Sequence, residues 1–304
     1  MRAADTMFDR RMVLAGSAAL GLAACVPIEA GTSARYAARL RIIEAAANGV
    51  LGASFLNTAT GEVISHNGYA RFPLLSSFKL SLAAMLLARD DTGGVNADER
   101  ITWTRGDLVE NSPFTTERLA MGATLRELAE ATQKTSDNTA ANLLLRRLGG
   151  PEGLTAFWRS LGDGVSRLDR FEPALNDVPP GETRDTTTPE AMARTVAALI
   201  HGESLALDRR AVLRQWMVDT RTGLARVRAG LPPEWLAGDK TGTSLAPGMG
   251  SVYVDIGFVE PPGRAPITFA TFFRAAGQHV RVEPAAQGVL AECGWVLARY
   301  ATGR

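Results

Sequence analysis

The sequence predicts an α+β fold, in which one antiparallel sheet is flanked by helices from both ends of the chain and carries an inserted all-helical domain. Three observations lead to this expectation. Strand-like segments occur near the start of the chain and again in its last third. Helical patterns fill the region between them. Turns rich in glycine and proline separate the late strands.

The first elements of the fold follow a helix–strand–strand–helix order. Residues 35–47 carry apolar side chains at helical spacing, which predicts a helix. Residues 50–56 and 62–65 favour strands, and the turn-forming segment 58–61 between them predicts a hairpin. Residues 80–88 then form a strongly helical segment.

The sequence pattern in the middle of the chain predicts several short helices. The last two are expected at residues 154–161 and 189–200. An irregular stretch with three prolines separates them at about residues 167–188. A structureless segment of this length in a compact domain is either functional or a misassigned element.

The last third predicts three strands and a closing helix. The strands are expected at residues 235–243, 252–259 and 267–273, and the helix at residues 284–299. This order predicts the following division: an export signal at residues 1–25, an α/β domain formed by residues 26–74 and 219–304, and a helical domain at residues 75–218.

The composition is that of an ordinary globular protein. The 304 residues are 46% hydrophobic and 21% charged, and the net charge is +1. The charges form no basic or acidic block, so neither nucleic acid nor an anionic membrane surface is indicated as a partner. We expect a monomer.

The N-terminus has the features of an export signal. Arg10 and Arg11 precede an apolar run at residues 12–24, which is too short to span a membrane. The paired arginines are similar to a twin-arginine signal. Leu-Ala-Ala-Cys at residues 22–25 resembles the lipobox of bacterial lipoproteins. We expect an exported, periplasmic protein that is either anchored through lipid on Cys25 or cleaved there without lipidation.

Lysine is rare in this chain, and its positions point to proton transfer. Only three of the 33 basic residues are lysines, namely Lys79, Lys134 and Lys240. A buried lysine can be shifted to a pKa at which it exchanges protons, whereas arginine stays charged. Because the chain otherwise uses arginine, lysine at these sites favours an amine that acts beside a serine.

Three short motifs surround these lysines. Ser-Ser-Phe-Lys at residues 76–79 opens a predicted helix, and its spacing puts Ser76 and Lys79 on the same face. Ser-Asp-Asn at residues 136–138 precedes a helix, and Lys-Thr-Gly at residues 240–242 ends a strand. Each has an ordinary explanation, as a helix cap, a polar turn or a strand end with an exposed lysine. All three together are far less expected by chance.

With these motifs the chain resembles the class A serine β-lactamases. The resemblance extends to Arg-Leu-Asp-Arg-Phe-Glu-Pro-Ala-Leu-Asn at residues 167–176, Arg-Asp-Thr-Thr-Thr-Pro at 184–189 and Arg-Ala-Gly-Leu-Pro at 228–232. It implies the fold shared by serine β-lactamases and DD-peptidases. It also implies that the protein hydrolyses the β-lactam ring of penicillins and cephalosporins through an acyl-enzyme. This activity would give antibiotic resistance, and it would need no cofactor.

The resemblance implies a role for each site residue. Ser76 would be the nucleophile, and its base would be either Lys79 or Glu172 acting through a water. Ser136 would relay a proton to the leaving nitrogen. The oxyanion hole would be the backbone N–H groups of Ser76 and Thr243. The substrate would be bound by Asn138, Asn176, Lys240, Thr241, Thr243 and Arg226, with Arg221 and Arg228 as alternatives to Arg226.

The irregular stretch would also gain a function. Glu172 and Asn176 would hold the water that releases the acyl group, and Arg170 and Asp185 would form a bidentate pair across the neck of this loop. Glu172 argues against the closest alternative, a penicillin-binding DD-peptidase that acylates but hardly deacylates. The alternative from another class is a catalytically silent receptor with this fold.

Neither a metal site nor a disulfide is expected. The histidines, His66, His201 and His279, are far apart in the sequence and lack ligand spacing. Cys25 and Cys293 are the only cysteines. If Cys25 is lipidated, Cys293 has no partner and is expected to be a small buried hydrophobe.

Overall fold

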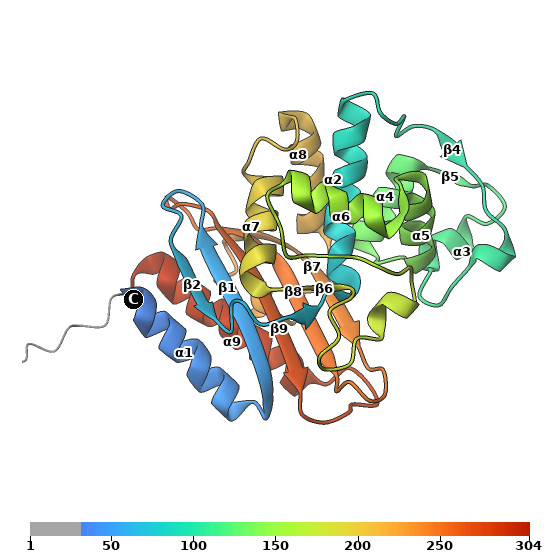
Figure 1. The fold of residues 1–304 in the computed structure, drawn as a ribbon. Coiled ribbons are helices and arrows are strands. Elements are labelled where there is room, and N and C mark those ends of the chain that lie inside the picture. The colour runs from blue at the N-terminus through green and yellow to red at the C-terminus, as the bar shows by residue number, and fades with distance from the viewer. Residues whose placement is uncertain (1–31) are drawn as a thin grey trace, which may run out of the picture.

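The computed structural model describes residues 32–304, so the predicted signal, with Arg10, Arg11 and Cys25, lies outside the described residues. A five-stranded antiparallel sheet forms the centre of this part of the chain (Figure 1). The strands, in spatial order, are β2 (Val63–His66), β1 (Gly49–Asn57), β9 (Ile267–Ala275), β8 (Val252–Glu260) and β7 (Leu236–Ser244). The predicted α+β fold, with a sheet built from both ends of the chain, is confirmed.

One face of the sheet is covered by the two terminal helices, α1 (Thr32–Ala46) and α9 (Pro284–Thr302) (Figure 1). Both lie close to their predicted positions. The hydroxyl of Tyr36 in α1 donates to the backbone carbonyl of Arg304, 3.0 Å away, and so ties the two ends of the domain together. Cys293 of α9 is fully buried in this layer, as expected, and burial raises the pKa of its thiol.

The other face of the sheet is covered by α7 (Pro189–Ile200) and, along β7, by α8 (Leu207–Asp219), and the other helices of the middle of the chain lie beyond them (Figure 1). At their centre is α2 (Phe78–Asp91), in which residues 78–87 are all buried. A helix that is buried on every side lies in the core of a domain. The helices around it are α3 (Pro113–Glu117), α4 (Leu125–Lys134), α5 (Asn138–Arg147), α6 (Gly150–Ser160) and α8 (Leu207–Asp219).

Helix α8 (Leu207–Asp219) is not predicted by its sequence pattern. Its buried side chains are only Leu213, Trp216 and Met217. A single narrow apolar stripe on an otherwise charged segment gives too weak a periodicity to separate a helix from a loop. The sequence therefore contains no pattern from which α8 could be predicted, although the helix packs against β7.

The irregular stretch predicted at residues 167–188 is a loop with two short elements. These are the 3₁₀ turn η3 (Ala174–Asn176) and the strand β6 (Thr186–Thr187). β6 pairs with β3 (Phe72–Pro73), which leads directly into the serine motif. The end of the loop is thereby held beside the start of α2. Within the described residues, no helix has the length and apolarity that a membrane crossing requires.

Candidate active site

Ser76 lies in the 3₁₀ turn η1 (Leu75–Ser77), two residues before α2 begins. Its Oγ is 3.0 Å from the Nζ of Lys79, in the first turn of α2. The N-cap position belongs to Ser77, whose hydroxyl donates to the carbonyl of Leu74, so a capping role does not account for Ser76. Leu75 has a φ of 48°, a left-handed conformation that a leucine adopts only under tertiary constraint.

The amine of Lys79 is fully buried among oxygen atoms from three segments. Nζ lies 2.9 Å from the carbonyl oxygen of Ser136, 2.5 Å from Oδ1 of Asn138 and 3.0 Å from Oε1 of Glu172. With Oγ of Ser76 at 3.0 Å and Oγ of Ser136 at 3.3 Å, five oxygen atoms surround an amine that has at most three N–H groups to donate. Burial lowers the pKa of Lys79, and the charge of Glu172 opposes this shift. Burial thus favours the neutral amine at Lys79 more than at an exposed lysine.

Lys240 approaches Ser136 from the sheet. Its Nζ lies 3.1 Å from Oγ of Ser136, and the Nζ of Lys79 is 3.3 Å from the same oxygen. Burial, followed by the charge of Lys79, lowers the pKa of Lys240 well below its usual value. Lys240 lies in β7, which agrees with the strand predicted at residues 235–243, and its side chain is fully buried, so the alternative of an exposed lysine at a strand end is wrong. The hydroxyl of Ser136 thus bridges two amines.

The third lysine lies outside this cluster. Lys134 is partly exposed and forms ion pairs with Glu130 at 3.0 Å and with Asp219 at 3.4 Å. Both partners raise the pKa of Lys134, which is the opposite of the shift at the other two lysines. Only two of the three lysines thus meet at the serines.

Glu172 is held between its own loop and helix α5. Asn176 donates to its Oε2 over 2.5 Å. Asn142 of α5 brackets the backbone of Glu172, since its amide nitrogen donates to the carbonyl and its amide oxygen accepts from the N–H, each over 2.9 Å. The motifs did not point to Asn142. Its position one helical turn after Asn138 is the signal that could have found it.

Strand β7 passes close to the backbone of the nucleophile turn. A Cβ at Gly242 would lie 2.8 Å from the Cβ of Leu75 and 3.1 Å from the backbone nitrogen of Ser76. Glycine is therefore required for this approach. This approach places β7, one residue before Thr243, against the backbone of Ser76, where the oxyanion hole is expected.

The structure distinguishes the three arginines near this end of the cluster. Arg226, which is 3% exposed, donates to Oγ1 of Thr243 over 2.5 Å. Arg228 is engaged in a buried ion pair with Asp239, and Arg221 is exposed. Of the three arginines, Arg226 is the one that contacts Thr243.

Solved structures and family comparison agree with this arrangement. An ancestral class A β-lactamase superposes with a TM-score of 0.82 at 46% identity, covering 87% of this chain and 99% of that one. A model of the β-lactamase enzyme family matches residues 35–298. The chain belongs to the class A β-lactamases.

Curated β-lactamases are similar over most of their length. β-Lactamase AST-1 from Nocardia asteroides is 43% identical over 86% of this chain and 87% of its own length. A β-lactamase from Streptomyces fradiae is 42% identical over 97% of both chains. The protein is therefore a hydrolase that opens the β-lactam ring, by the serine mechanism general to class A, and so gives β-lactam resistance.

In this β-lactamase, the neck of the loop that carries Glu172 is closed by Arg170 and Asp185. Nε of Arg170 donates to Oδ2 of Asp185 over 2.5 Å. Oδ1 accepts instead from the backbone N–H groups of Asp169 at 2.7 Å and Arg170 at 3.0 Å. The pair is therefore not bidentate, which corrects the prediction. Asp185 is fully buried, and its carboxylate organises three donors.

We expect Asp185→Asn to loosen the loop that carries Glu172. The substitution removes the negative charge that faces Arg170, and it places an N–H₂ group beside the N–H donors that now bind the carboxylate. Losing such a charged hydrogen bond destabilises the loop by about 1.5–3 kcal/mol. Hydrolysis of good penicillins should fall, while bulky cephalosporins should gain from the wider opening. Steady-state kcat/KM for both classes tests this, with the exposed Asp177→Asn of the same loop as the control. Unchanged kinetics for every substrate would show that the pair has no structural role.

Proposed function

We propose that this β-lactamase hydrolyses penicillins and cephalosporins with Ser76 as the nucleophile. The observation that supports this most strongly is that one buried amine, Lys79, lies 3.0 Å from both the hydroxyl of Ser76 and the carboxylate of Glu172. An activated serine needs a base in direct reach. Burial favours the neutral form of Lys79, and this neutral amine takes the proton of Ser76 as its hydroxyl oxygen attacks the lactam carbonyl, so Glu172 remains a carboxylate.

The leaving nitrogen receives its proton through Ser136. The hydroxyl of Ser136 lies between the amines of Lys79 and Lys240, at 3.3 and 3.1 Å. A proton taken from Ser76 by Lys79 can therefore move to Ser136 and on to the ring nitrogen. The backbone N–H groups of Ser76 and Thr243 stabilise the oxyanion, at roughly 3–4 kcal/mol per donor.

The substrate carboxylate binds at the β7 end of the site. Lys240 supplies positive charge, and the hydroxyls of Thr241 and Thr243 supply donors. Arg226 holds the hydroxyl of Thr243 in place through its 2.5 Å contact. At the other end, Asn138 faces the amide side chain of the substrate, although its own amide already contacts Lys79 and the carbonyl of Glu110.

Release of the acyl group depends on Glu172 and Asn176. Asn176 donates to one carboxylate oxygen of Glu172, which leaves the carboxylate oriented toward the Lys79 side of the site. Glu172 then acts as the general base on a water that attacks the acyl-enzyme. A steady-state assay with a chromogenic cephalosporin and a panel of penicillins tests the substrate classes, and the absence of turnover with every one of them would contradict the proposal.

The protein is further proposed to be an exported, periplasmic monomer that is held at the membrane through lipid on Cys25. This rests on the N-terminal residues alone. Cys25→Ala should move β-lactamase activity from the membrane fraction to the soluble fraction. Equal solubility of the two forms would rule out lipidation. Changing Arg10 and Arg11 to lysines should stop export only if the twin-arginine route is used.

A further inference from the structure

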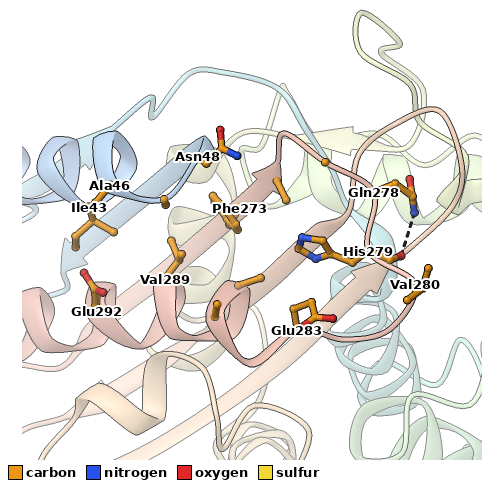
Figure 2. A pocket seen from close by; sticks show the side chains of 15 residues that line it. Ile43, Ala46, Asn48, Phe273, Gln278, His279, Val280, Glu283, Val289 and Glu292 are labelled. Carbon is orange, nitrogen blue, oxygen red and sulfur yellow. Dashed lines mark hydrogen bonds between the residues drawn. The ribbon is translucent and has the colours of Figure 1, made fainter.

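A cavity of about 670 Å³ lies on the face of the sheet that the terminal helices cover (Figure 2). It is bounded by the end of α1, the end of β9, the connecting segment 276–283 and the first turns of α9. Ser76 and the catalytic cluster lie on the other face of the sheet. The volume is within the range of small-molecule sites, and nothing in the proposed mechanism uses this space.

The lining of this cavity combines an apolar floor with two acids. The floor is made by Ile43, Phe273, Ala286 and Val289. Glu283 and Glu292 lie toward opposite ends, with Val289 between them (Figure 2). Because Ala285, Val289 and Glu292 are four and three residues apart along α9, they share one face of that helix.

The charge of the lining is one-sided. Among the described residues that line the cavity, none is a lysine or an arginine. Glu292 forms no ion pair within residues 32–304, and Glu283 faces only Arg281, at 3.5 Å, whose side chain is 82% exposed. Opposite charge placed against a partly apolar wall is attracted more strongly than in open water. The cavity therefore favours a cation with an apolar body over an anion.

The wall of the cavity is connected to the carboxylate end of the active site. Nδ1 of His279, which lines the cavity, is 2.8 Å from the hydroxyl of Tyr253 in β8, and the backbone N–H of Glu283 donates to the same hydroxyl over 3.1 Å. The guanidinium carbon of Arg226 lies 5.7 Å from the centre of the Tyr253 ring. Arg226 in turn donates to Thr243. An unbroken series of contacts thus crosses the sheet.

We propose that this cavity is a regulatory site for a small hydrophobic amine, whose binding changes the affinity of the active site for the substrate carboxylate. The apolar part of the ligand lies on the floor, and its ammonium group contacts one of the two glutamates. Occupation fixes the segment that carries His279 and Glu283, and Tyr253 transmits this to Arg226. The regulatory part rests on the proposed role of Arg226 and Thr243 in substrate binding.

Binding is tested directly with 4-phenylbutylamine on the whole enzyme, with 4-phenylbutanol and 4-phenylbutyrate as neutral and anionic controls. In NMR titrations the amine should bind most tightly and the carboxylate most weakly. The double variant Glu283→Gln, Glu292→Gln should bring the amine to the level of the alcohol. Equal binding of the three probes to the parent enzyme would overturn the proposal.

A pair of variants locates the binding. Ala46→Trp fills the cavity from the end of α1, while Ala45→Trp adds the same exposed side chain one residue outside it. The amine should bind to Ala45→Trp as to the parent and fail to bind to Ala46→Trp. Equal binding to both variants would place the amine elsewhere and overturn the proposal.

The regulatory part is tested by kinetics. Saturating amine should change the KM for benzylpenicillin at least about fivefold with little change in kcat, since typical allosteric couplings change affinity about 5–150-fold. Tyr253→Phe should still bind the amine and lose this effect. Thr243→Val separates the two hypotheses. If Thr243→Val raises KM but the amine has no effect on the parent, regulation is wrong, whereas an unchanged KM in Thr243→Val contradicts the proposed carboxylate site itself.

Discussion

Replacing Ser76 with alanine is expected to lower the turnover of a penicillin by roughly 10⁴–10⁶-fold, as loss of the nucleophile does in other serine hydrolases. The hydroxyl of Ser76 lies 3.0 Å from the buried amine of Lys79. Without it no acyl-enzyme can form, so covalent labelling by a penicillin should disappear as well. Burst kinetics and intact-mass spectrometry measure the two losses separately.

Ser77→Ala is the matched control for this experiment. Ser77 follows the nucleophile directly, and its hydroxyl donates to the carbonyl of Leu74 within the same turn. Losing that bond costs about 1 kcal/mol of stability and leaves the contact between Ser76 and Lys79 in place. Labelling should therefore survive in Ser77→Ala. If both variants lost labelling, the structure of the turn would be responsible, and the assignment of Ser76 would have no support.

Glu172→Ala should reduce turnover by at least about 10²–10⁴-fold, the usual contribution of a positioned general base. The reason is that the substitution removes the group that activates the deacylating water, while Lys79 still contacts Ser76. Acylation should therefore persist, though more slowly. Glu182→Ala provides the control, because Glu182 is a glutamate of the same loop that pairs only with Arg184 and its neighbours.

The same variant decides between the two candidate bases for acylation. If Lys79 accepts the proton of Ser76, Glu172→Ala still forms the acyl-enzyme in a single-turnover experiment. If Glu172 accepts it through a water, acylation falls together with deacylation. The second result would contradict the proposed role of Lys79, even though Nζ lies 3.0 Å from the serine hydroxyl.

Much of the fold could be predicted because its strands and buried helices have clear periodicity. β7, β8 and β9 lie within a few residues of their expected bounds, and so does the central helix α2. Helix α8 could not be predicted, since its three buried side chains leave almost no pattern. Local sequence predicts an element well when most of one face is buried, and poorly when tertiary contacts hold a mainly polar segment.

The site shows the same division. The motifs indicated Ser76, Lys79, Ser136 and Lys240, but they contain no information on which oxygen atoms surround each amine. Three arginines close together in sequence near residue 226 could not be separated until the fold showed that one reaches Thr243. Asn142 and the close approach at Gly242 depend on segments that meet only in the folded chain.

A time course of intact mass after mixing with a penicillin tests the hydrolytic mechanism most directly. Wild type should clear the acyl adduct quickly and return to its unmodified mass once the substrate is consumed. Glu172→Ala should hold an adduct one drug mass heavier for far longer. If wild type holds the adduct indefinitely, the chain is a penicillin-binding protein, and if neither protein is ever labelled, Ser76 is not a nucleophile toward β-lactams.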